Sequence, residues 1–128
     1  MRLVEKIPLP NGFVAEVWDQ SRAIAADTRQ VVLLVRVTVT LKPEYFPDIE
    51  QFRITKDAFG KEVRYELKKE RTFVADSEAQ RVFSVFWDEF KRDALSYLSK
   101  EKFPAGLALS KYMEIRKNPY KYGQMVGR

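Results

Sequence analysis

Residues 77–99 limit most strongly how this chain can fold, because they form a long amphipathic stretch. Apolar residues recur there at steps of three and four, as on one face of an α-helix. They are Ala79, Val82, Phe83, Phe86, Phe90, Ala94, Tyr97 and Leu98. Ser77 and Gln80 form an S-x-x-Q pattern that predicts a capping box at the helix start. Such a helix is about 35 Å long at ~1.5 Å per residue, so it needs a broad apolar surface to pack against.

A predicted β-strand at residues 28–42 (TRQVVLLVRVTVTLK) supplies part of that surface. From Val35 onward, apolar and polar residues alternate, as in a strand with one buried and one solvated face. Residues 13–19 (FVAEVWD) and 61–74 (KEVRYELKKERTFV) predict two further strands. The sequence leaves open whether the strand at 61–74 is central or at an edge, because its inward positions become charged towards its end.

The remaining segments complete an α+β prediction. Residues 43–60 could form a short helix, an irregular excursion or a short strand, and a second helix is expected at 110–118, after a break at Pro104-Ala105-Gly106. We therefore expect a mostly antiparallel sheet of three to four strands packed on one long C-terminal-half helix, plus a short second helix. Residues 1–118 are predicted to be a single domain, and residues 119–128 a basic, tyrosine-containing tail.

Composition argues against most catalytic chemistry. The chain has no histidine and no cysteine, which removes the commonest general base, the thiolate nucleophile and the usual zinc ligands. Its five glycines form no phosphate-binding loop motif. We therefore expect no enzyme activity and no cofactor. One enzyme hypothesis stays open, in which Asp19 and Asp27, around a connection between two strands, act as an acid/base pair or hold a cation. Both residues are equally typical of turns.

Hydropathy gives no reason to expect a membrane protein. The first residues contain no long apolar core of a signal peptide. The longest apolar run is Val31–Val35, five residues, whereas a membrane-spanning helix needs about 20. We expect a soluble, cytoplasmic protein without a membrane partner.

The net charge of +5 is confined to the end of the chain. Residues 1–99 contain 16 basic and 16 acidic residues, whereas residues 100–128 contain 7 basic and 2 acidic ones. A localised basic segment is typical of proteins with an anionic partner. The candidate binding residues are therefore the cations and tyrosines of this segment. They are Lys111, Tyr112, Arg116, Lys117, Tyr120, Lys121 and Tyr122. A secondary candidate is the cluster of Lys68, Lys69 and Arg71 on the strand at 61–74.

These observations favour a small, non-catalytic interaction module whose C-terminal segment contacts an acidic partner. The alternative is a nucleic-acid-binding protein that uses the same segment for phosphate neutralisation and base stacking. Aromatic residues flanking the helix stripe, such as Trp87, could also form a partner surface and make the protein a homodimer. The carboxylate-dependent enzyme is the third hypothesis.

Overall fold

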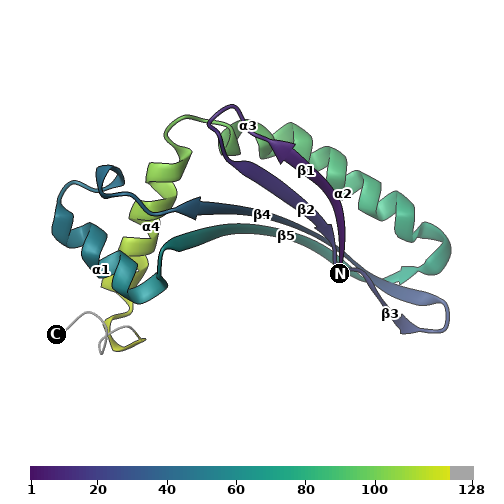
Figure 1. The fold of residues 1–128 in the computed structure, drawn as a ribbon. Helices are drawn as coiled ribbons and strands as arrows, with labels where there is room; N and C mark the ends of the chain where they lie inside the picture. The colour runs from purple at the N-terminus through teal and green to yellow at the C-terminus, as the bar shows by residue number, and fades with distance from the viewer. Residues whose placement is uncertain (122–128) are drawn as a thin grey trace. The chain divides into compact units, whose positions relative to one another are not determined.

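The computed structural model describes residues 1–121 of the chain and has an α+β architecture (Figure 1). Its strands are β1 (Arg2–Pro8), β2 (Val14–Asp19), β3 (Arg22–Ala25), β4 (Thr28–Thr40) and β5 (Glu62–Ala75). Its helices are α1 (Ile49–Phe59), α2 (Ala79–Asp93), α3 (Leu95–Leu98) and α4 (Phe103–Lys117), with the 3-10 turns η1 (Pro43–Tyr45) and η2 (Asp76–Glu78). The predicted fold class is confirmed, with five strands in place of three to four.

The five strands form one sheet in the order β1-β2-β4-β3, and β5 also pairs with β4. The pairs β1–β2, β2–β4 and β3–β4 are antiparallel. Among the described strands, β5 pairs with β4 alone, which leaves its other edge open. The alternating charges that made β5 ambiguous in the sequence are typical of an edge strand, because they discourage pairing with another chain.

The described chain divides into two compact units. Unit 1 comprises residues 1–37 and 66–100, and unit 2 comprises residues 38–65 and the chain from 101 onward. The strands β4 and β5 contribute residues to both units. Of the predicted tail 119–128, residues 119–121 are exposed, and the rest lies outside the described residues.

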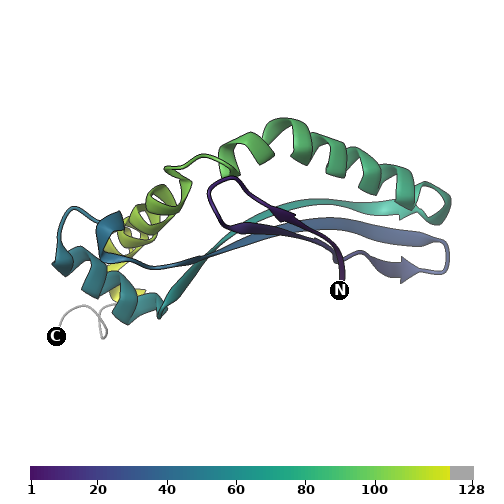
Figure 2. The same ribbon diagram turned by 45° about the horizontal axis from the view of Figure 1, so that its top comes forward.

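The core of unit 1 lies between the sheet and α2 (Figure 2). Because residues paired across antiparallel strands share a face, the pairs Ala15↔Val37 and Val17↔Val35 mark the buried face of β2 and β4. All four side chains are fully buried. The buried residues of α2 are Val82, Phe86 and Phe90. Two contacts hold α2 against β5: Lys69 Nζ lies 3.5 Å from Glu89 Oε1, and the Arg71 guanidinium lies 5.8 Å from the Phe86 ring centre.

Unit 2 is built around the contact between α1 and α4. Asp48 caps α1, since its Oδ1 accepts the Gln51 N–H at 2.9 Å. Thr55, the buried polar residue of the core, donates its hydroxyl to the Gln51 carbonyl at 2.8 Å. Edge-to-face aromatic pairs complete the packing, with ring centres 5.9 Å apart for Phe46–Phe52 and 5.6 Å for Tyr65–Phe103.

The predicted helix at 77–99 is correct in place but wrong at both ends. The α-helix begins at Ala79 after η2, and its N-cap residue Glu78 makes no side-chain capping bond, so the predicted capping box is absent there. The helix ends at Asp93, and Ala94, with φ −115° and ψ −29°, is its C-cap before the short α3. The amphipathic stripe continues across Ala94, which is why its periodicity did not reveal the interruption.

Three other segments differ from the sequence prediction. The expected break at Pro104-Ala105-Gly106 is wrong, because α4 begins at Phe103 and Pro104 lies in its first turn. Proline is tolerated there, since its missing N–H would have no partner within the helix. Residues 2–8 and 22–25 form the strands β1 and β3, which the sequence did not predict. The ambiguous segment 43–60 contains η1 and the three-turn helix α1.

Candidate functional site

Unit 1 contains an open groove of about 480 Å³ between α2 and the sheet face that α2 covers. Its polar lining residues are Arg2, Asp19, Ser21, Arg29, Gln80 and Ser84. Its apolar lining residues are Val4, Ala79, Phe83 and Trp87. The volume lies within the range of small-ligand sites, about 300–1,000 Å³.

The charged residues of the groove occupy positions where the strand pattern would place apolar side chains. Asp19 follows Ala15 and Val17 on the buried face of β2. On β4, the side chain of Arg29 lies on the same face of the strand as those of Val31 and Leu33. Arg2 of β1 pairs with Asp19 of β2. The apolar core therefore ends at Leu33 and Val31, and the next inward positions on three strands are charged.

Hydrogen bonds fix the acidic side of this cluster. Asp19 Oδ2 lies 3.4 Å from Arg2 Nη2, and Asp19 Oδ1 accepts the Ser21 N–H at 2.8 Å. The Ser21 hydroxyl oxygen in turn accepts the Val32 N–H at 3.0 Å. The Arg29 guanidinium lies 3.6 Å from Asp76 Oδ1. Each guanidinium thus meets a carboxylate through one nitrogen, while the carboxylate of Asp19 is engaged at both oxygens.

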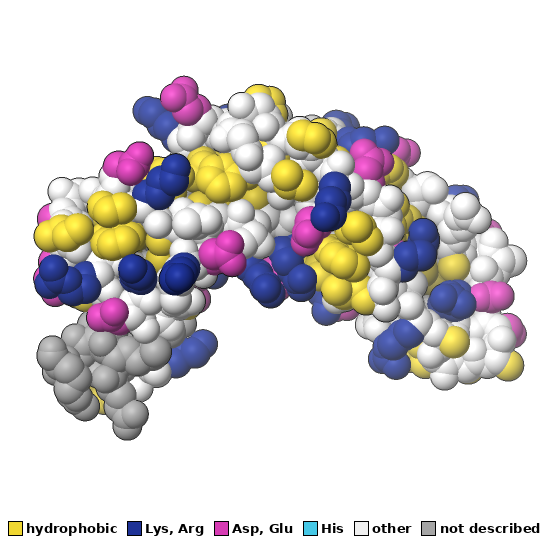
Figure 3. All heavy atoms as spheres, in the orientation of Figure 1, with side chains coloured by type: hydrophobic (Ala, Val, Ile, Leu, Met, Phe, Trp, Pro, Cys, Tyr) yellow, Lys and Arg dark blue, Asp and Glu magenta, His cyan; other side chains and the backbone are white. Residues whose placement is uncertain are grey.

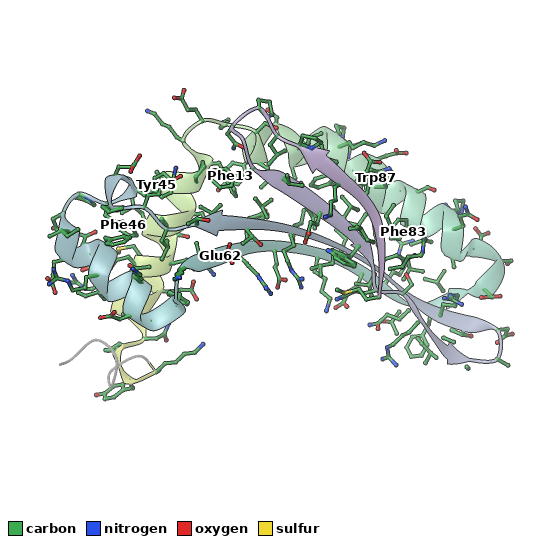
Figure 4. The ribbon with its side chains drawn as sticks, viewed as in Figure 1. Phe13, Tyr45, Phe46, Glu62, Phe83 and Trp87 are labelled. Carbon is green, nitrogen blue, oxygen red and sulfur yellow. The ribbon has the colours of Figure 1, made fainter. Side chains whose placement is uncertain are left out.

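The aromatic wall of the groove comes from α2. Phe83 and Trp87 lie one turn apart on the side of α2 that faces the strands (Figure 4). Trp87 stacks on the buried Phe90, with ring centres 5.7 Å apart and planes inclined by 6°. Lys91 Nζ lies 5.1 Å from the Trp87 ring centre. These contacts hold the Trp87 ring in one orientation.

The C-terminal candidate residues fall on two opposite faces of α4. Met113, Arg116 and Lys117, spaced by three and four residues, share the outer face, where all three are exposed. Lys111 lies on the inner face with the buried Ile115. Its Nζ is 3.3 Å from Glu114 Oε2 and 5.7 Å from the Phe59 ring centre. Lys111 therefore contributes to the packing of unit 2.

The tyrosines of the C-terminal set also differ in exposure. Tyr112 is half-buried, whereas Tyr120 is fully exposed just beyond α4, next to the exposed Lys121. Tyr122 lies outside the described residues. We define the α4 surface as Met113, Arg116, Lys117, Tyr120 and Lys121.

The secondary candidates Lys68, Lys69 and Arg71 do not form one patch. Lys69 and Arg71 face α2, where they contact Glu89 and Phe86. Lys68 points to the opposite face of the sheet by strand alternation. On the face shown in Figure 3, basic side chains are likewise interspersed with acidic and hydrophobic ones.

The carboxylates of the enzyme hypothesis are not brought together. Asp19 lines the groove, but Asp27 does not, and its side chain instead lies 3.2 Å from the Thr28 hydroxyl in the β3–β4 turn. Within residues 1–121, no group of three or more acidic residues is arranged to hold a metal ion.

Comparisons with known proteins identified no relative of this chain. No protein-family model matches the chain, and neither the curated proteins nor the solved structures searched contain a match. No helix in the described part of the chain has the length and apolar character needed to cross a bilayer.

Sequence reasoning missed the groove and its two arginines. A signal was present, because Arg29 continues the buried alternation of β4 as a charged residue. That signal could not be combined with Arg2, since β1 was not recognised as a strand.

Proposed function

We propose that this protein is a non-catalytic interaction module that binds an acidic protein partner through the α4 surface. The observation that supports this proposal is the charge balance of the surface. Within residues 1–121, neither Arg116 nor Lys117 pairs with a carboxylate, while the neighbouring Glu114 is engaged by the inward-facing Lys111. Arg116 and Lys117 are therefore presented to solvent without local neutralisation.

Apolar exposure favours a protein partner over a nucleic acid. Met113 is 49% exposed between the cations, and methionine is well suited to adaptable protein contacts. A fully exposed Tyr120 extends the apolar part of the surface. Aromatic residues and methionine with arginine are enriched in protein interfaces, and clustered cations speed the encounter with an acidic partner.

Nucleic-acid binding is the second candidate, because Tyr120 could stack on a base while Arg116, Lys117 and Lys121 contact phosphates. It is less well supported, since Lys111 contacts Glu114 and Phe59, and two of the β5 cations, Lys69 and Arg71, contact residues of α2. The two functions are distinguished by the probe that binds.

Fluorescence anisotropy of the full chain tests the proposal with two labelled probes. One is a peptide of alternating glutamate and leucine, and the other is a single-stranded oligothymidine of matched charge. We expect the peptide to bind more tightly than the oligonucleotide and to dissociate as salt is raised. The R116E/K117E variant should bind the peptide at least about tenfold more weakly, a loss of ~1.4 kcal/mol.

The matched control is K42E/K61E, which changes the net charge equally at two exposed positions of unit 2 outside the α4 surface. Its affinity for the peptide should stay within about twofold of the parent. Equal weakening by both variants would reduce the effect to net charge and contradict the proposal. Tighter binding of the oligonucleotide would establish the nucleic-acid function instead.

A further inference from the structure

We propose that the groove in unit 1 binds a small organic carboxylate with a flat apolar body. This inference does not depend on the α4 surface, because every residue that lines the groove belongs to unit 1.

The hydrogen-bonding groups that line the groove favour a ligand that accepts hydrogen bonds. Each guanidinium has five N–H donors, and Arg2 and Arg29 each contact a carboxylate through one nitrogen. Within residues 1–121, the side chains of Gln80 and Ser84 make no hydrogen bond, so both can reach a ligand. Each oxygen of Asp19 already accepts one hydrogen bond, from Arg2 and from the Ser21 N–H. Donors are therefore in excess, which favours an anion.

A carboxylate suits these donors because a guanidinium can bind its two oxygens with two parallel hydrogen bonds. Arg2 and Arg29 have side chains 72% and 36% exposed, so both remain accessible from solvent. Arg2 and Arg29 bring two positive charges to the groove lining, in which Asp19 is the acidic residue, while the carboxylate that meets Arg29, Asp76, lies outside the lining.

The opposite wall selects a flat apolar body. Phe83 and Trp87 line the groove from successive turns of α2, with Val4 on the strand side. The stacking of Trp87 on Phe90 fixes its ring before a ligand arrives. A rigid wall lowers the entropic cost of binding, because fewer side chains must be ordered. The groove thus combines a cationic end with an aromatic face.

Titration of the ¹⁵N-labelled full chain with 1-naphthoate tests this inference. The two tryptophans give two indole N–H signals, which a W87F variant assigns. Trp87 lines the groove, whereas Trp18 lies on the other face of β2 and serves as an internal control. We expect the Trp87 signal to shift with a dissociation constant of about 1 mM or lower, and the Trp18 signal to stay in place. The neutral 1-naphthamide should bind at least about tenfold more weakly, because it lacks the charge.

Variants locate the binding groups. R2Q and R29Q should each weaken naphthoate binding about tenfold, and Q80E should abolish it by placing a negative charge in the groove. The matched control is R81Q, because Arg81 neighbours Gln80 on α2, lies outside the groove lining and pairs with Glu78 at 2.6 Å. R81Q should change the affinity by less than about twofold.

Several results would overturn the inference. They are no shift of Trp87 at millimolar naphthoate, equal binding of naphthoate and naphthamide, or an effect of R81Q as large as that of R2Q and R29Q. Inorganic phosphate binding as tightly as naphthoate would refute the role assigned to the aromatic wall.

Discussion

Asn11 is expected to be one of the most sensitive polar positions in unit 1. It lies between β1 and β2, and its side-chain nitrogen donates to the carbonyls of Leu98 at 2.8 Å and Lys100 at 2.9 Å. Its side-chain oxygen accepts the Phe13 N–H at 3.2 Å. One amide therefore holds the turn and satisfies two carbonyls at the end of α3. Because each such bond contributes about 0.5–1.5 kcal/mol, N11A should lower the free energy of unfolding by roughly 2–3 kcal/mol.

Urea unfolding followed by far-UV circular dichroism measures this loss. With an m-value of ~2 kcal/mol per molar, the expected decrease in the midpoint is about 1–1.5 M. The matched control is N118A, because the Asn118 side chain makes an exposed bond of 3.3 Å to the Glu114 carbonyl at the end of α4. Removing that bond should cost about 0.5 kcal/mol or less.

The variant N11D separates hydrogen bonding from side-chain size. A carboxylate keeps the acceptor for Phe13 but turns an anion towards two carbonyl oxygens, so N11D should be less stable than N11A at pH 7. Below about pH 4 the carboxyl becomes protonated, loses its charge and can donate one hydrogen bond while it still accepts the Phe13 N–H, so N11D should then be at least as stable as N11A. The reasoning is refuted if N11A costs no more than N118A, or if N11D matches the parent chain at pH 7.

Three further predictions concern the packing, one backbone conformation and one ion pair of unit 1. Replacing the fully buried Phe90 by alanine should lower the free energy of unfolding by about 3–5 kcal/mol. F73N should instead raise the urea midpoint, since Phe73 is 79% exposed and has φ +61°, a conformation that asparagine adopts at lower cost; an unchanged or lower midpoint would contradict this reading. The hydrogen bond from Arg92 lowers the pKa of Asp93, so that pair stabilises the fold at neutral pH and the effect is lost as the pH falls below about 4. The midpoint difference between D93N and the parent should therefore be present at pH 7 and shrink as the pH falls below about 4, and a difference that stays constant there would exclude the ion pair as its cause.

The parts of the fold that the sequence predicted are those with a local apolar period. Val35 and Val37 on β4, and Phe86 and Phe90 on α2, are buried as their spacing indicates. The missed elements lack such a period. In β1 most side chains are exposed and the pairing with β2 is irregular between Leu3 and Glu5, so no alternation survives in the sequence.

The candidate binding surfaces depend on contacts between residues of different segments, and these contacts cannot be predicted from any one segment of the sequence. Periodicity alone could have placed Lys111 and Met113 on different faces of α4, but the burial of Ile115 and the contact of Lys111 with Phe59 show which face is inward. The groove requires the register of β1 and β2, because Arg2 meets Asp19 only through that pairing. Residues 1–99 are neutral overall, so net charge could not reveal a cationic site there.

The two proposed sites can be judged independently because they lie in different units and use different chemistry. The α4 surface is exposed, with cations beside Met113, and its affinity for an acidic peptide should depend strongly on salt. The groove pairs Arg2 and Arg29 with an aromatic wall, so a neutral analogue of its ligand loses only the ionic part of the binding energy. If R116E/K117E abolishes peptide binding while naphthoate still shifts Trp87, the chain carries two separate sites. If R2Q weakens binding of the acidic peptide instead, the groove itself receives an acidic side chain of the partner, and the arginines of β1 and β4 would replace α4 as the centre of the interaction.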